Sequence, residues 1–176
     1  MTTTTEPTPA PTADTRVASL LMMATYVLGG VGYFLGFQQA ASSDAASAIA
    51  PVAVLSVGLV GIVSMIRHSV FHRSDAVRMG WDLGRRNNFQ IEVGFANLAI
   101  GVPALLAVVL DWGTAAQAVL VLAYGLYFAQ VAVLSAIDVR TEGRDAIRRM
   151  AVMASMAVLL GWFALVALAE IDARPF

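Results

Sequence analysis

The feature that most constrains this chain is a series of five long apolar runs separated by short polar segments. A helix needs about 20 mostly apolar residues to cross the roughly 30 Å hydrocarbon core of a bilayer. We therefore predict an all-α fold, an integral membrane bundle of five transmembrane helices. The expected spans are residues 17–38, 51–66, 89–110, 114–137 and 150–169. The shortest of them is expected to continue through the turn at 67–71, with its arginine reaching toward headgroups.

Composition agrees with this class and narrows the function. Charged residues make up 13% of the chain, about half of what a soluble domain carries. A net charge of -1 gives no reason to expect nucleic acid as a partner. The chain has no cysteine, which excludes disulfides and thiolate metal sites. The sequence contains no nucleotide-binding loop, nucleophile elbow or zinc motif.

The distribution of arginine predicts the orientation of the bundle. With five spans, Arg16 and the two arginine-rich loops at 67–86 and 140–149 fall on one side, and only Arg174 falls on the other. Positive residues in short loops mark the cytoplasmic side, so we expect the N-terminus inside and the C-terminus outside. The first apolar run is too long for a cleaved signal peptide. Arginine without lysine, in an alanine-rich chain, suggests a multi-pass protein of a bacterial cytoplasmic membrane.

The polar segments divide the chain into a tail and one membrane domain. Residues 1–15 lack apolar periodicity and are expected to be a disordered tail, while residues 16–176 form the transmembrane domain. The loop at 67–88 mixes apolar residues with five arginines. This pattern is typical of a short amphipathic helix in the inner headgroup layer, where its charge would bind anionic lipid.

Small residues are expected to set the distances between helices, because they allow close backbone contact in lipid. The glycines expected to pack helices are Gly32, Gly36, Gly94, Gly101 and Gly161. Such residues mark either a homo-oligomer interface or contacts within one bundle, and we favour the second interpretation. In the helix at 89–110, two opposite faces are small, one with Gly94 and Gly101 and one with Ala96, Ala99 and Pro103. We therefore expect this helix to have neighbours on two sides.

A polar cluster in the cytoplasmic half of the bundle is the best candidate site. Its members are Glu92, Asn97, Gln130, Ser64 and Ser155. Ionisable groups inside a membrane are functional candidates, often as proton relays or ion ligands. Glu92 also has a structural interpretation, which we favour: it lies near a helix start, where the macrodipole favours an acid, and close to Arg85 and Arg86. Asn87 and Gln90 have capping-box spacing in the same turn.

Two histidines four residues apart give a weaker candidate for metal ligation. His68 and His72 share a face if the second helix continues, and with Glu92 they would form a two-His-one-carboxylate set. However, Arg67 and Arg73 flank the pair and would repel a cation. We therefore expect no metal, haem or other cofactor at this position.

One segment resembles a known family. Gly80-Trp81, followed by Phe89-Gln90-Ile91-Glu92-Val93-Gly94-Phe95-Ala96-Asn97-Leu98-Ala99-Ile100-Gly101, resembles the core motif of small bacterial membrane proteins known only as a domain of unknown function. The run Gly29–Tyr33 and the turn at His68–Phe71 are similar as well. The likeness covers roughly residues 22–105, although Asn87-Asn88 stands where relatives carry Ser-Pro. The resemblance implies a multi-span fold and draws attention to Glu92 and Asn97.

Three functions remain open at this point. The leading hypothesis is a non-catalytic membrane protein that acts as a subunit, partner or oligomeric scaffold. The second is a transporter or channel for protons or a small solute, with Glu92, Asn97 and Gln130 lining the path. The third is a redox or lipid-modifying enzyme that uses the two histidines.

The topology can be tested with reporter fusions. We expect a reporter fused after Phe176 to behave as extracytoplasmic and one inserted in the 140–149 loop to behave as cytoplasmic, because the arginines stay inside. Alkaline phosphatase and fluorescent-protein activity would be measured for both fusions. Two fusions on the same side would contradict the five-span topology.

Overall fold

The computed structural model describes residues 13–42, 45–80, 82, 84 and 86–172, and its regular elements are all helical. In chain order they are α1 (Arg16–Ser42), α2 (Ala45–Pro51), η1 (Val52–Leu59), α3 (Val60–Met65), η2 (Ile66–Val70), α4 (His72–Met79), α5 (Asn88–Val109), α6 (Thr114–Glu142) and α7 (Arg144–Asp172), where η marks a π-helix. Within these ranges, five helices are long and apolar enough to cross a membrane. The prediction of an all-α, five-span fold is confirmed. The predicted tail lies outside the described residues up to Thr12, as do Arg85 and Arg174.

The second span, Ala46–Val70, is one continuous helix that changes its type along its length. It extends beyond residue 66, as the sequence predicted, and its final turn is wide because Phe71 N–H donates to Ile66 O at 3.1 Å. A hydrogen bond between residues five positions apart closes a π-helical turn, and such turns within helices are often found at functional sites. Here it carries Arg67 and His68 at the end of the span.

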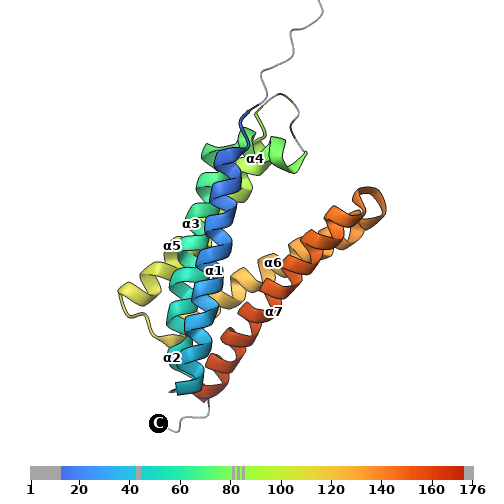
Figure 1. Cartoon of the computed structure of the whole chain (residues 1–176). Coiled ribbons are helices and arrows are strands. Elements are labelled where there is room, and N and C mark those ends of the chain that lie inside the picture. The colour runs from blue at the N-terminus through green and yellow to red at the C-terminus, as the bar shows by residue number, and fades with distance from the viewer. Residues whose placement is uncertain (1–12, 43–44, 81, 83, 85, 173–176) are drawn as a thin grey trace, which may run out of the picture.

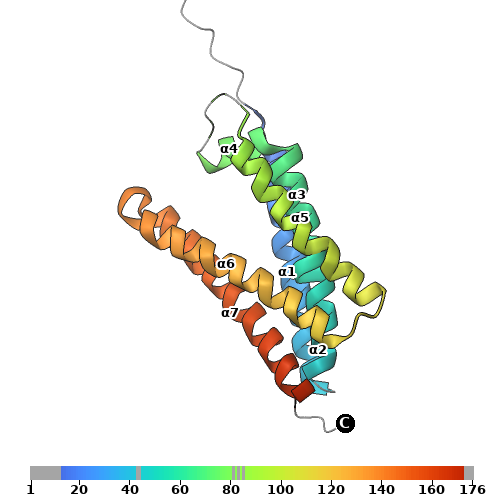
Figure 2. The same ribbon diagram turned by 180° about the vertical axis from the view of Figure 1, so that it is seen from behind.

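The helices form two groups that meet at one end and separate toward the other. α1, the second span and α5 pack together, while α6 and α7 form a hairpin that leans away toward the end that carries α4 (Figure 1). The view from behind has the same arrangement (Figure 2). One residue, Gly143, links the two hairpin helices with φ of +60°, a conformation that favours glycine. At 29 residues, α6 is about 44 Å long, which exceeds the roughly 30 Å of hydrocarbon, and its last turns carry the charged residues Asp138, Arg140 and Glu142.

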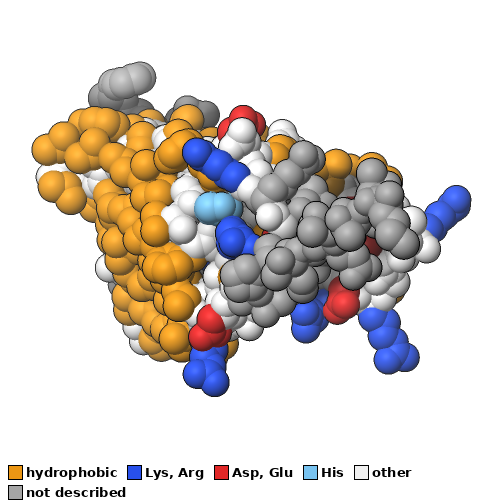
Figure 3. Space-filling view, turned by 90° about the horizontal axis from the view of Figure 1, so that it is seen from above, with side chains coloured by type: hydrophobic (Ala, Val, Ile, Leu, Met, Phe, Trp, Pro, Cys, Tyr) orange, Lys and Arg blue, Asp and Glu red, His pale blue; other side chains and the backbone are white. Residues whose placement is uncertain are grey.

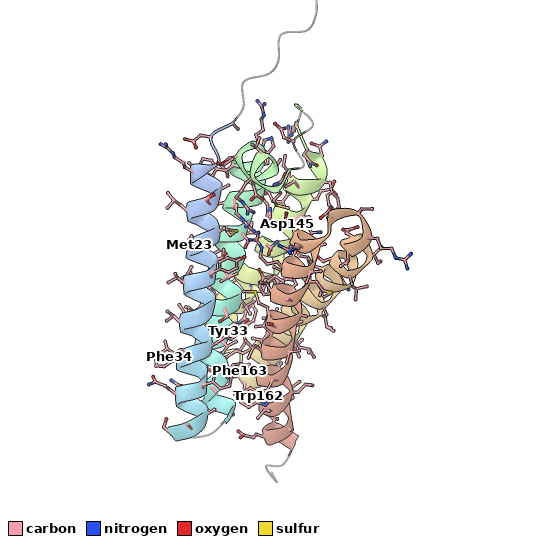
Figure 4. All side chains as sticks on the ribbon, turned by 45° about the vertical axis from the view of Figure 1, so that its right-hand side comes forward. Met23, Tyr33, Phe34, Asp145, Trp162 and Phe163 are labelled. Carbon is pink, nitrogen blue, oxygen red and sulfur yellow. The ribbon has the colours of Figure 1, made fainter. Side chains whose placement is uncertain are left out.

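The two groups are held together where α1, α2 and α7 meet. Glu170 Oε2 accepts a hydrogen bond of 2.7 Å from Ala46 N–H, which places a carboxylate at the N-terminus of α2. Tyr33 on α1 stacks on Phe163 of α7 with ring centroids 6.2 Å apart. In Figure 4 these two rings point toward each other, whereas Met23 and Phe34 lie on the outer face of α1. This end of the molecule therefore contains the aromatic part of the core.

Glycines bring the backbones of the first group close together. A Cβ at Gly101 would lie 2.9 Å from Gly58 O and 3.1 Å from Gly61 Cα, so α5 and the second span touch backbone to backbone. Gly32 lies against Leu55 and Ser56, Gly36 against Val52 and Phe163, and Gly94 against Ser69. A Cβ at Gly161 would meet nothing within 4 Å, and the close contact on that helix pair is made by Gly125.

α5 buries one face only, contrary to the expectation of neighbours on two sides. Its buried residues are Gln90, Gly94, Asn97, Gly101, Ala104 and Ala107. Glu92, Ala96 and Ala99 on the other face are exposed. A small side chain permits a close neighbour but does not require one, since alanine is as compatible with lipid as it is with a helix contact.

We expect Gly101→Ala to lower the melting temperature in detergent, because the new methyl group would meet backbone that cannot move aside. Overpacking of this kind costs about 1–3 kcal/mol. The matched control is Gly161→Ala, which adds the same methyl group to open space and should leave stability unchanged or slightly higher. Differential scanning fluorimetry would compare the two. Equal melting temperatures would mean that α5 and the second span can separate at no cost.

Candidate functional site

Among the described residues, the largest group of buried charges lies at the end of the bundle that carries α4. α4 turns its Ser74–Ala76 face inward, and Asp75 is completely buried. Arg78 donates two hydrogen bonds to Asp75 Oδ1, from Nη2 at 2.9 Å and from Nε at 3.2 Å. Gln90 Nε2 of α5 donates to Asp75 Oδ2 at 2.8 Å. We call Arg67, His68, Asp75, Arg78 and Gln90 the Asp75 cluster.

The wide turn of η2 contributes the other two members of the cluster. His68 Nδ1 lies 2.8 Å from Asp75 Oδ2, and Arg67 Nε lies 3.9 Å from Asp75 Oδ1. Arg67 Nη2 donates to His68 Nε2 at 2.8 Å. Because arginine can only donate, His68 accepts at Nε2, and a neutral ring then carries its proton on Nδ1, next to the carboxylate. That N–H is poorly aligned with Asp75, so the contact is chiefly electrostatic.

These neighbours keep Asp75 ionised. Burial alone would raise the pKa of Asp75, but His68, Arg67 and Arg78 act in the opposite direction and hold it at about 2, below its ordinary value of 3.8. A buried carboxylate is stable only when it is paired and hydrogen-bonded, and here it is both. The cluster thus joins α4, the second span and α5 through a single anion.

Asn87 and Gln90 form only one of the two hydrogen bonds of a capping box. Asn87 is the N-cap of α5, and its Oδ1 accepts from Gln90 N–H at 3.2 Å. The Gln90 side chain does not return to Asn87, because it is bound to Asp75 instead. Its Oε1 is buried without a hydrogen-bond donor among the described residues.

A second, smaller group of polar residues lies deeper in the bundle. Tyr124 of α6 donates its hydroxyl hydrogen to Asn97 Oδ1 of α5 at 2.6 Å, and Ser64 lies within hydrogen-bonding reach of the same hydroxyl. Asn97 Nδ2 donates to Val93 O at 2.7 Å and makes a long contact of 3.5 Å with the Tyr127 hydroxyl. These bonds tie the α6–α7 hairpin to α5, and such interhelical bonds contribute about 0.6 kcal/mol each on average.

An open hollow of about 370 Å³ lies between α1 and α7 on the side where the two groups diverge. Its wall is mainly apolar, with hydroxyl groups from two tyrosines and one serine. The lining residues are Tyr26, Gly30, Tyr33, Ala151, Val152, Ser155, Met156 and Leu159. We call it the α1–α7 cavity.

The structure brings together only part of the predicted polar cluster. Asn97 and Ser64 meet at Tyr124, and Ser155 lines the α1–α7 cavity while donating to Ala151 O at 2.8 Å. Glu92 and Gln130 are exposed and make no side-chain hydrogen bond or ion pair with the described residues. The predicted partner Arg85 lies outside those residues.

The two histidines have different surroundings. His68 belongs to the Asp75 cluster, whereas His72 Nδ1 lies 3.1 Å from Ser69 O. In the described part of the chain, no group of three His, Cys, Asp or Glu side chains has the geometry to hold a metal ion. Seen from above, a histidine lies between arginine side chains on this end, and apolar side chains cover the flank (Figure 3).

Sequence reasoning overlooked Asp75, the residue around which this end is organised. The signal was present: Asp75 is an acid in an arginine-rich segment, three residues before Arg78. At that spacing an acid and a base share a helix face. The loop was interpreted as an amphipathic surface helix, but α4 buries its polar Ser74–Asp75 face instead of exposing it.

The fold and the buried clusters define a multi-pass helical membrane protein. The chain belongs to DUF6790, a family of unknown function, which matches residues 16–174. This agrees with the resemblance to an uncharacterised domain family noted from the sequence. No curated protein and no solved structure matches the chain.

We expect Asp75→Asn to destabilise the protein strongly, because Arg67 and Arg78 would remain buried without their anion. Removing one member of a buried ion pair costs about 3–5 kcal/mol. Asp145→Asn is the control: Asp145 is exposed near the α6–α7 turn, 3.9 Å from Arg148, and its loss should change little. The melting temperatures of both variants in detergent test this.

The low pKa of Asp75 predicts that the protein loses stability in acid. The folded pKa of Asp75, about 2, lies below its ordinary value of 3.8, so folding favours the ionised form. Its contribution is therefore complete above about pH 4 and is lost as the pH falls toward about 2. The wild type should lose stability across this interval by more than Asp75→Asn. Parallel pH profiles for the two proteins would contradict the proposed role of the carboxylate.

Proposed function

We propose that the protein is a non-catalytic membrane subunit that binds another membrane-embedded protein through its α6–α7 hairpin. The observation that carries this proposal is the divergence of the hairpin from the rest of the bundle, which leaves apolar side chains exposed along it. On α6 these include Leu126, Val133, Leu134 and Ile137. In a bilayer, helices associate through close packing and hydrogen bonds. Apolar character alone gives no driving force, because the lipid tails are equally apolar.

The buried polar groups support a structural role for the centre of the molecule. Asp75 is paired with Arg67 of η2 and Arg78 of α4, and Asn97 is bound to Tyr124 across two helices. These bonds hold elements of the bundle together. A protein built in this way acts through its surface.

The orientation and membrane form part of the same proposal. The arginines favour an N-terminus in the cytoplasm and a C-terminus outside, in a bacterial cytoplasmic membrane. Transport is the alternative function, with Glu92, Asn97 and Gln130 along one path. The exposed positions of Glu92 and Gln130 do not favour it, since a path needs its polar groups to face a common interior.

The absence of cysteine allows a direct test, because each introduced thiol is the only one in the chain. We expect Leu134→Cys on α6 to give a discrete cross-linked product in native membranes with a bifunctional maleimide. Leu20→Cys on α1 is the matched control, because its side chain is also well exposed, at 70% against 61% for Leu134. Products would be identified by mass spectrometry.

A product at twice the chain mass identifies a second copy as the partner, and a larger or smaller adduct identifies another subunit. Both support the proposal if the control thiol gives neither. Equal cross-linking from the two positions, or none from either, would contradict it. Proton flux in liposomes that is lost in Glu92→Gln would favour transport instead.

A further inference from the structure

The α1–α7 cavity lies between two candidate membrane spans, so its open side faces the hydrocarbon of the bilayer. Whatever occupies it must be apolar over most of its length. The cavity volume of about 370 Å³ falls within the range of roughly 300–1,000 Å³ that is typical of small-molecule sites.

The wall of the cavity is mainly apolar, and an acyl chain can lie along it without leaving any polar group unpaired.

The depth of the cavity corresponds to one leaflet. Arg78 Nη1 lies 3.0 Å from Met22 Sδ on α1, one helical turn before Tyr26, where the cavity begins. Along α1, the distance from Met22 to Tyr33 is about 16 Å. Half of the hydrocarbon core measures about 15 Å. A lipid whose phosphate lay at the level of Arg78 would thus extend an acyl chain to Tyr33.

The positive charge at the α4 end of the cavity favours the binding of an anion there. With His68 neutral, the Asp75 cluster holds two arginines against one carboxylate, which leaves one positive charge in excess. The Arg67 and Arg78 side chains are 13% and 21% exposed, and Arg67 Nε, itself buried, has no hydrogen-bond acceptor among the described residues. A phosphate supplies both the charge and the acceptor oxygens that arginine binds.

We propose that the α1–α7 cavity binds one anionic phospholipid, with an acyl chain between α1 and α7 and the phosphate beside Arg67 and Arg78. Binding of this kind differs from the general attraction of basic loops to anionic membranes, because it requires the cavity as well as the charge. It is independent of any protein partner at the outer flank of α6.

The chain offers a matched pair of glycines for the test. Gly30 lines the cavity, and a Cβ there would meet nothing within 4 Å, so Gly30→Leu fills the cavity without displacing protein. Gly161→Leu makes the same change at another open position that does not line the cavity. Ser155→Leu fills the cavity from α7 and provides a second blocking variant. Each protein would be purified in detergent and titrated with dioleoylphosphatidylglycerol, dioleoylphosphatidylcholine or inorganic phosphate.

We expect phosphatidylglycerol to raise the melting temperature of the wild type and of Gly161→Leu, and native mass spectrometry to detect one bound lipid. The apparent affinity should fall at least tenfold in Gly30→Leu and Ser155→Leu. Equal lipid effects in all four proteins would overturn the proposal, as would an equal effect of phosphatidylcholine. Stabilisation by inorganic phosphate alone would also overturn it, because the acyl chain would then contribute nothing.

Discussion

The Asp75 carboxylate is the constraint on which the α4 end of the molecule depends. Its charge is buried, and a buried charge is tolerated only with partners that are fixed in place. Those partners come from η2, α4 and α5, so each of these elements has one permitted position relative to the others. α4 in turn holds the start of α1, because Ser74 Oγ donates to Asp14 O and accepts from Ala18 N–H. One anion therefore sets the arrangement of four elements.

Inside the spans, close backbone contact fixes the positions of the helices relative to one another. The close approach of Gly61 and Gly101 leaves no space for a side chain, so α5 and the second span have a fixed register. The hairpin is attached differently, through the Asn97–Tyr124 hydrogen bond and the aromatic contact of Tyr33 with Phe163. Buried side chains of α6 and α7, among them Val121 and Leu160, also share one apolar core with Val52 of the second span.

The sequence predicted the spans well because the demand for apolar residues acts on each segment separately. The predicted span 114–137 and the observed α6, Thr114–Glu142, begin at the same residue. Which face of a helix meets a neighbour was harder to predict, as the exposed Ala96 and Ala99 demonstrate. The Asp75–Arg78 spacing is a local signal, but the other members of the cluster lie up to 23 positions apart, from Arg67 to Gln90, and no local pattern joins them to Asp75. The π-helical turn that places Arg67 and His68 beside Asp75 has no sequence signature either.

The bond between Glu170 and Ala46 has a consequence for the order of assembly during synthesis. Contacts among α1, the second span and α5 can form once Val109 has left the ribosome, because all their residues have then been made. The N-terminus of α2 must wait for a carboxylate that lies 124 residues further along the chain. Until α7 has been synthesised, the nascent chain therefore lacks the bond that joins the N-terminus of α2 to the hairpin.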